Sequence, residues 1–235
     1  MKFRQHIPNS ITLGNLIFGC LAIYFLLVYQ QPQQAFWFIY LALIGDFLDG
    51  WIARKLGVSS SLGKDLDSLA DGVTFGVFPS FLILHCFTKF SDFEGFKFIS
   101  LAIAAASIYR LANFNQAGTP KDYFLGLATP ANTFFAIGIF YWCSSASFSP
   151  LVNGIILIIY SSLSWFLLNA KIPLFSFKNL KKPFFYNVHI LIFFFLSLII
   201  FLFLRELAIA PIIIIYILLS LTLKKYFIYA KTKPE

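Results

Sequence analysis

The sequence predicts an all-α integral membrane protein of about eight transmembrane helices, and three observations indicate it. Hydrophobic residues make up 59% of the 235 residues and charged residues only 12%, a balance far more apolar than that of a soluble domain. Apolar runs of helix length recur along the chain. Lysine and arginine also collect in alternate loops, as they do in membrane proteins that cross the bilayer several times.

A helix of about 20 apolar residues crosses the roughly 30 Å hydrocarbon core of a bilayer. The first run follows a segment too short and polar for a signal peptide, so we expect this helix to be retained. Acidic residues shorten the second run, the third is apolar after a charged start, and a short turn joins the last two into a hairpin. The eight predicted spans are residues 11–29, 35–48, 62–87, 96–108, 124–142, 151–168, 184–204 and 207–223.

The loop charges predict that both termini face the cytoplasm. One side of the membrane receives only Lys89, Lys97 and Arg205. The other side receives Lys2, Arg4, Arg54, Lys55, Lys64, Lys121, Lys171, Lys178, Lys181, Lys182, Lys224, Lys225, Lys231 and Lys233. The net charge of +8 then indicates attraction to anionic lipid headgroups. No basic stripe with interleaved aromatic residues points to nucleic acid.

Carboxylates gather where the second and third predicted helices meet. Ten residues of the chain are acidic, and five of them fall between Asp46 and Asp71. Acids within membrane helices are costly and usually functional. Asp46 and Asp49 lie three residues apart and Asp67 and Asp71 four apart, so each pair shares one helix face. If the two helices form a hairpin across residues 55–61, the four carboxylates converge near the cytoplasmic surface.

Four carboxylates at close range need a countercharge. Mg²⁺ or Mn²⁺ supplies it and keeps positions open for water and substrate phosphates. Two such ions about 4 Å apart suit an in-line displacement at phosphorus. Gly50, Ala53 and Gly63 share these faces and leave a floor for a flat nucleotide base, while Arg54 adds a cation for phosphate oxygens.

Two alternatives compete with a metal site. The acids could be solubility residues or ion-pair partners of Arg54, Lys55 and Lys64, which explains a single aspartate better than the whole group. Asp65 points away from its neighbours and is expected to be exposed. A divalent-cation transporter would also carry acids in membrane helices, but it predicts acids through the bilayer midplane rather than at one side.

Together these residues resemble the signature of the CDP-alcohol phosphotransferase family, D-x2-D-G-x2-A-R-x8-G-x3-D-x3-D. All eight fixed positions are filled with the family's spacing, by Asp46, Asp49, Gly50, Ala53, Arg54, Gly63, Asp67 and Asp71. The resemblance implies an enzyme with a six-helix core, often dimeric, whose polar cavity opens to the cytoplasm. The last two predicted helices then form a C-terminal hairpin added to that core.

The resemblance also implies a role for each position. Asp46, Asp49 and Asp67 correspond to metal ligands. Asp71 lies at the same metal site and corresponds to the base that takes the proton of the acceptor hydroxyl. The positions that bind the CDP moiety are Asp49, Gly50, Ala53, Arg54 and Gly63.

Three stretches are similar to the bacterial phosphatidylserine synthase branch of the family, namely residues 7–16, residues 66–77, and residues 109–115 together with 124–131. That branch transfers a phosphatidyl group from CDP-diacylglycerol to L-serine and releases CMP, here by an expected metal-assisted, direct in-line displacement. Asn113 stands where a basic residue is usual and Ala128 where proline is usual. Glycerol 3-phosphate or an inositol phosphate is the alternative acceptor, although a phosphorylated acceptor needs more cations than this region offers.

Several polar residues outside the motif have more than one possible role. Arg110 either anchors the serine carboxylate or a substrate phosphate, or it pairs with an aspartate or reaches to the surface. Asn113 could support Arg110 or cap its helix. His85 falls near the outer end of its helix, too far from the acids to act as a base. Caps of the first helix are predicted at Asn9, Ser10 and Thr12, with contact to the nucleotide or the acceptor as the alternative.

The resulting organisation is a membrane domain over residues 1–170 with the motif at 46–71, a basic cytoplasmic loop over 171–183, and a hairpin with a basic tail over 184–235. We expect the protein in a bacterial-type inner membrane, with the site facing the cytoplasm. CDP-diacylglycerol, L-serine and membrane lipids are the predicted partners, together with a second copy of the chain in a homodimer.

Overall fold

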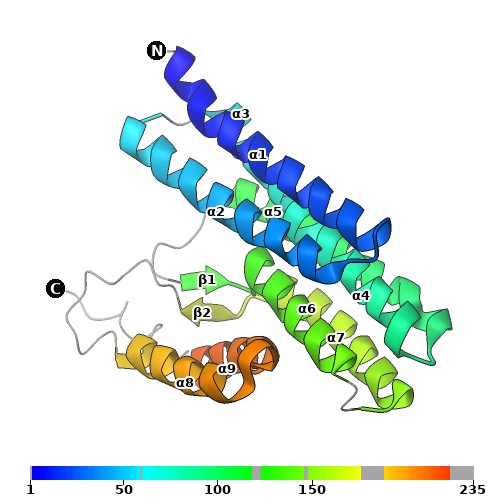
Figure 1. The fold of residues 1–235 in the computed structure, drawn as a ribbon. Coiled ribbons are helices and arrows are strands. Elements are labelled where there is room, and N and C mark those ends of the chain that lie inside the picture. Colours follow the sequence, from blue (N-terminus) through cyan, green and yellow to red (C-terminus); the bar gives the residue numbers. More distant parts are fainter. Residues whose placement is uncertain (1, 59, 118–122, 146–147, 176–187, 223–235) are drawn as a thin grey trace.

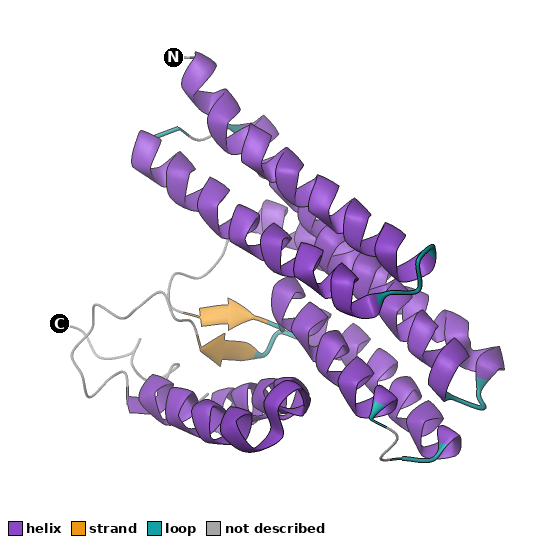
Figure 2. Cartoon of the chain, in the orientation of Figure 1, coloured by secondary structure: helices purple, strands orange, loops and turns teal. Residues whose placement is uncertain are grey.

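The computed structural model describes residues 2–58, 60–117, 123–145, 148–175 and 188–222, which form a mostly helical chain (Figure 1). The α-helices are α1 (Lys2–Leu27), α2 (Pro32–Leu56), α3 (Ser61–Asp71), α4 (Phe78–Phe90), α5 (Leu101–Ala117), α6 (Thr129–Ser144), α7 (Pro150–Asn169), α8 (Val188–Leu204) and α9 (Ile209–Thr222). Three further helical turns are the π-helix η1 (Gly72–Val77) and the 3₁₀-helices η2 (Glu94–Ser100) and η5 (Arg205–Ala208). Two short strands, β1 (Tyr123–Leu125) and β2 (Pro173–Phe175), pair antiparallel beside the helices (Figure 2), so the all-α prediction missed a small ribbon.

The described helices make this an integral membrane protein. Six segments are long and apolar enough to cross a bilayer, namely His6–Leu27, Pro32–Leu56, Ser61–Phe90, Glu94–Gln116, Pro150–Asn169 and Ile190–Thr222. The last segment contains α8, η5 and α9, and it folds back at Arg205, whose φ is 49°. The hairpin turn predicted there is confirmed, and α8 and α9 lie side by side (Figure 1). Helix α6 has 16 residues and is shorter than the six spans.

Capping residues fix the turn between α2 and α3. Gly57 ends α2 in the left-handed conformation with φ 62°, and its N–H reaches the last carbonyls of the helix. A residue with a Cβ adopts this conformation only at a cost, so glycine suits the position. Ser60 then begins α3 by accepting a hydrogen bond of 3.0 Å from the Gly63 N–H, which satisfies one of the free donors of the first helical turn. The predicted short turn is therefore confirmed.

The helix that carries Asp67 and Asp71 changes its pitch directly after Asp71. Pro79 has no N–H, so the carbonyl of Phe75 one turn earlier loses its usual helical partner. The hydroxyl of Thr133 on α6 donates to that carbonyl at 3.1 Å instead. The Thr133 side chain thus supplies a hydrogen bond to a backbone carbonyl that cannot bond to water within a membrane helix.

Helix α1 packs along α2 and also against α3 and η1, so it covers one side of the junction between them. In Figure 1, α1 and α2 run side by side for most of their length. Gly19 makes the close approach to η1 possible, because a Cβ there would collide with the side chain and the Cα of Thr74. The predicted capping role of Asn9, Ser10 and Thr12 is wrong, since α1 begins at Lys2 and continues through Pro8.

The span predicted over 124–142 begins too early. Leu125 belongs to β1, and the helix starts at Thr129 with Pro130 in its first turn, where proline is well tolerated. Between them, Gly126 has φ 68° and lies against the carbonyls that end α7. Its N–H donates a hydrogen bond of 2.9 Å to the backbone carbonyl of Ile172. The chain therefore makes a turn against the end of α7 before it enters α6.

Three apolar clusters hold the described chain together, and the smallest joins α8 to α9 through Ile190 and Phe193. The largest one joins α1, α2, α4, α5, α6 and α7 through buried side chains such as Phe36, Phe78 and Phe87. A smaller one joins α9 to β2 and to the start of α6 through Ile217, Leu174 and Leu127. Parts of the predicted basic loop and the hairpin start (176–187), and the whole basic tail (223–235), lie outside the described residues.

The close contact at Gly19 gives a test of the packing. We expect Gly19→Ala to lower the melting temperature in detergent by about 3–10 °C, because overpacking a close contact costs roughly 1–3 kcal/mol. A Cβ at Gly14 on the same helix would have nothing within 4 Å, so Gly14→Ala is the matched control. An equal melting temperature for both variants would contradict this account of how α1 packs.

Candidate functional site

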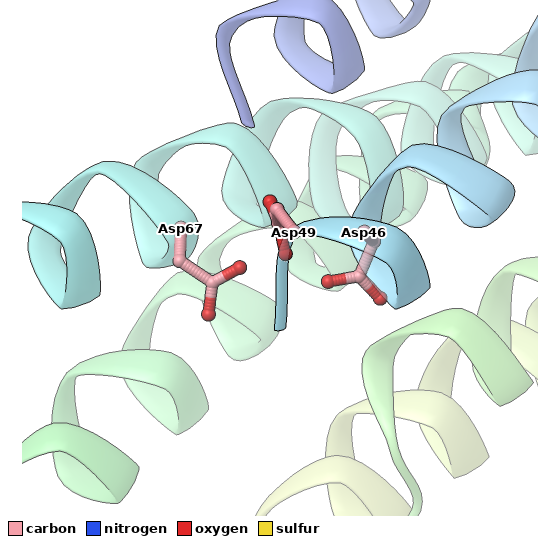
Figure 3. Close-up of side chains that lie close together, drawn as sticks. All are labelled: Asp46, Asp49 and Asp67. Carbon is pink, nitrogen blue, oxygen red and sulfur yellow. The ribbon is translucent and has the colours of Figure 1, made fainter. Parts of the chain in front are cut away.

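Three carboxylates meet where α2 and α3 converge. Each of Asp46, Asp49 and Asp67 offers one oxygen, and these oxygens lie within 4.8 Å of one another. Figure 3 shows Asp67 on α3 facing the two aspartates of α2. The sequence analysis predicted that four carboxylates would converge here, and three of them do, whereas Asp71 lies outside this group.

The chemistry of this group fits a hard divalent cation. Asp49 is only 5% exposed, and Asp46 and Asp67 are half-buried, so water screens their mutual repulsion poorly. Carboxylate oxygens are the ligands that Mg²⁺ and Mn²⁺ prefer. An ion held by Asp46, Asp49 and Asp67 would remove the repulsion between them. The cluster is therefore a candidate metal site, with the number and identity of the ions left to experiment.

Asp71 lies one turn further along α3 and is not part of this group of three. The side-chain amide of Asn15 on α1 donates to Asp71 Oδ1 at 3.4 Å. The π-helical turn η1 starts at the next residue, and such turns are frequent at functional sites. Asp71 is thus placed beside the cluster with a different set of neighbours.

Helix α1 gives the acids two hydrogen bonds that the sequence analysis missed. The Thr12 hydroxyl donates to Asp49 Oδ2, with the Pro8 carbonyl as a second acceptor within reach, and Asn15 donates to Asp71. Both are buried. Their three-residue spacing puts them on one face, and that spacing of polar residues in a membrane helix was the available signal.

A cavity of about 420 Å³ opens beside the acids, a volume within the usual range for small-molecule sites. All five residues predicted to bind CDP line it, namely Asp49, Gly50, Ala53, Arg54 and Gly63. Pro8, Asn9 and Thr12 of α1 line it too, as do Lys64 and Asp67. The structure therefore brings the predicted nucleotide residues and two of the clustered acids into one cavity.

Two glycines of this cavity leave space that a side chain would fill. A Cβ at Gly50 would lie 3.3 Å from a guanidinium nitrogen of Arg54. At Gly63 it would lie 3.0 Å from the amide oxygen of Asn9 and 3.1 Å from the Ser60 hydroxyl. Substitution at either position would crowd polar groups that face the cavity.

Helix α5, which carries Arg110 and Asn113, packs against α3 and η1. Arg110 donates to the Leu125 carbonyl at 3.3 Å, while its buried Nε has no partner among the described residues. Asn113 is exposed, and its predicted acceptor role stays a prediction. Both residues lie inside α5 rather than at its end.

A second link ties α5 to α3 near this position. Asn115 donates its amide to Ser68 at 2.7 Å, and its carbonyl accepts a hydrogen bond of 2.7 Å from Lys64. Asp65 is exposed, as expected.

The described histidines and cysteines stand apart from the cavity lining. His85 lies 14 residues beyond Asp71 along the same run of helix, a separation of roughly 20 Å at the helical rise. Cys86 and Cys143 are buried in the large apolar cluster. These positions agree with the prediction that His85 is not the base.

Membrane helices with an acidic cluster beside a nucleotide-sized cavity define a class of integral membrane enzyme that handles phosphate-bearing substrates. The sequence profile of the CDP-alcohol phosphatidyltransferase family matches residues 5–177. The chain therefore belongs to this family and is a transferase of phospholipid synthesis.

Curated relatives agree with this assignment. The CDP-diacylglycerol–serine O-phosphatidyltransferase of Bacillus subtilis is 40% identical over 126 residues, covering 54% of this chain and 70% of that protein. The protein of the same name from Methanocaldococcus jannaschii is 35% identical over 159 residues, covering 65% of this chain and 67% of that protein. The one from Mycobacterium tuberculosis is 31% identical over 175 residues, with 68% and 60% covered.

The metal site can be tested without any turnover. We expect the purified protein to bind Mn²⁺ in a titration followed by electron paramagnetic resonance, and each of Asp46→Asn, Asp49→Asn and Asp67→Asn to weaken binding at least tenfold. Asp65→Asn is the matched control, because this nearby carboxylate is exposed and lies outside the cluster. Equal weakening by the control, or none by the three variants, would rule out the proposed ligands.

Proposed function

We propose that this protein transfers the phosphatidyl group of CDP-diacylglycerol to L-serine, forming phosphatidylserine and releasing CMP. The observation that carries the proposal is the single cavity in which the predicted CDP-binding residues meet the clustered acids. The names of the relatives support serine as the acceptor.

The proposed division of labour follows the position of each residue. Asp46, Asp49 and Asp67 would hold Mg²⁺ or Mn²⁺, two ions in the full site, with Asp71 at its edge. Such ions would neutralise the diphosphate and the departing CMP. Arg54 would bind phosphate oxygens from the wall of the cavity, beside the space that Gly50 leaves for its guanidinium.

The transfer itself would be direct. The serine oxygen attacks the phosphorus that carries diacylglycerol, and the bond from that phosphorus to the bridging oxygen breaks. CMP leaves with the electron pair, and Asp71 takes the hydroxyl proton. A carboxylate is a weak base for a hydroxyl, so the proton moves late, when the new phosphorus–oxygen bond is well advanced. No described cysteine or histidine lines the cavity to offer a covalent route.

Arg110 would bind the serine carboxylate. Its guanidinium is fixed by the Leu125 carbonyl, and its buried Nε keeps a donor without a partner in the described chain. A free carboxylate is a strong acceptor for such a donor. The packing of α5 against η1, which begins directly after Asp71, supports a place for serine between the anchor and the base.

We further propose the arrangement in the membrane that the charges predict. Residues 1–170 would form a six-helix core, and residues 184–235 an added hairpin and tail, giving eight crossings with both termini and the site at the cytoplasmic face. The family match ends at residue 177, which supports a boundary in the basic loop over 171–183. The protein would reside in a bacterial inner membrane and would form a homodimer there.

Release of CMP in detergent micelles tests the reaction. With CDP-diacylglycerol and Mg²⁺ or Mn²⁺, we expect CMP release with serine and none with glycerol 3-phosphate or an inositol phosphate. Asp71→Asn should lower the rate at least a thousandfold and leave the protein folded, because it removes the base. Release only with a phosphorylated acceptor would overturn the serine assignment, and wild-type activity of Asp71→Asn would overturn the base.

Substitution of Arg110 and of Arg54 should raise the KM of different substrates. We expect Arg110→Gln to raise the KM for serine roughly ten- to hundredfold, the scale of a lost hydrogen bond to a charged group, with little change for CDP-diacylglycerol. Arg54→Gln should do the reverse, because Arg54 lines the nucleotide cavity. A parallel rise of both KM values in either variant would contradict these roles.

A further inference from the structure

Asn15 is a buried amide in an apolar membrane helix, and the family signature does not include it. Its exposed fraction is 0%. Its Nδ2 donates to Asp71 Oδ1 at 3.4 Å, and its Oδ1 has no partner among the described residues. A buried amide left half satisfied is costly within a membrane, so its contact with Asp71 needs an explanation in function.

The backbone around Asn15 fixes its position relative to the helix that carries Asp71. The hydroxyl of Thr74 donates to the Asn15 carbonyl at 3.3 Å. One turn further along α1, Gly19 permits the close approach to Thr74. The amide of Asn15 is therefore held at a set distance from Asp71 by a contact between α1 and η1.

Asn15 and Thr12 donate hydrogen bonds to different carboxylates. Thr12 donates to Asp49, which belongs to the group of three, whereas Asn15 donates to Asp71, which does not. One oxygen of Asp71 is thus engaged toward α1, and the other is left to accept a proton.

We propose that Asn15 is a positioning residue for Asp71, which engages Oδ1 of this carboxylate and presents its Oδ2 to the acceptor hydroxyl. The proposal rests on the proposed function, because it gives Asp71 the role of base. Asn15 touches neither substrate nor ion in this scheme and acts through Asp71 alone.

Asn15→Leu removes the donor and keeps a side chain of similar size. We expect kcat with serine to fall roughly ten- to hundredfold, the range for loss of a hydrogen bond to a charged group. The KM for CDP-diacylglycerol and the affinity for Mn²⁺ should stay within about twofold of wild type, because no group of the cavity or of the cluster changes.

Asn153 on α7 supplies a matched control. It is also a buried amide, 3% exposed, whose Nδ2 donates at 3.1 Å, to the Phe90 carbonyl, and whose Oδ1 lacks a partner in the described chain. Phe90 is 19 residues beyond Asp71, roughly 28 Å along the helix. Asn153→Leu should cost similar stability and leave kcat unchanged.

The outcomes separate this proposal from the proposed function. If Asp71→Asn is inactive while Asn15→Leu keeps the wild-type kcat, only the role of Asn15 fails. If Asp71→Asn is active, the base assignment fails, and Asn15 loses its role with it. Loss of Mn²⁺ binding or of melting temperature in Asn15→Leu beyond that in Asn153→Leu would make Asn15 structural and overturn the proposal.

A second variant keeps the test open if Asn15→Leu does not fold. Asn15→Ala also removes the donor and adds no charge beside Asp71, and the same loss of kcat is expected from it in a folded protein. A wild-type kcat in Asn15→Ala would overturn the proposal.

Discussion

The structure depends on bringing three carboxylates together at the end of two membrane helices. Their oxygens lie within 4.8 Å of one another, and like charges at that distance stay ionised together only when a countercharge is supplied. The protein places small residues and an arginine next to them, along a cavity that the same helices form. Without a cation, the three carboxylates repel one another. Binding cations together with a diphosphate would remove this repulsion, so the electrostatic cost of burying the acids would favour binding of the substrate.

Helix α1 turns this junction into an ordered site. It packs along α2, reaches α3 and η1, and gives one polar side chain to each side of the acid group, Thr12 to Asp49 and Asn15 to Asp71. The close contact of Gly19 with Thr74 couples the packing of the bundle to the geometry of the site. On α5, Arg110 donates to a carbonyl of β1, and the ribbon that contains β1 packs against α9. The C-terminal hairpin is thereby connected to the region where an acceptor would enter.

The acid cluster and the nucleotide cavity could be predicted from the sequence because both depend on local spacing. Asp46 and Asp49 share a helix face, and Gly57 and Ser60 set the turn that brings Asp67 to them. The start of α6 could not be predicted, because the run over 124–142 is apolar while its first residues pair with a strand from elsewhere in the chain. The hydrogen bonds of Thr12 and Asn15 depend on which helices pack together, and one apolar helix offers many faces. The capping role predicted for Thr12 was wrong because a polar residue in the first turns of a predicted helix suits a cap and a buried site equally well.

The central claim is that Asp46, Asp49 and Asp67 hold metal against the diphosphate of a bound CDP-lipid. Anomalous X-ray scattering from crystals grown with Mn²⁺ and CDP-diacylglycerol tests it most directly. The account predicts manganese peaks in contact with these three carboxylates, with the nucleotide in the cavity lined by Gly50, Ala53 and Gly63. Manganese bound elsewhere, or a nucleotide outside this cavity with the three carboxylates free of metal, would contradict it.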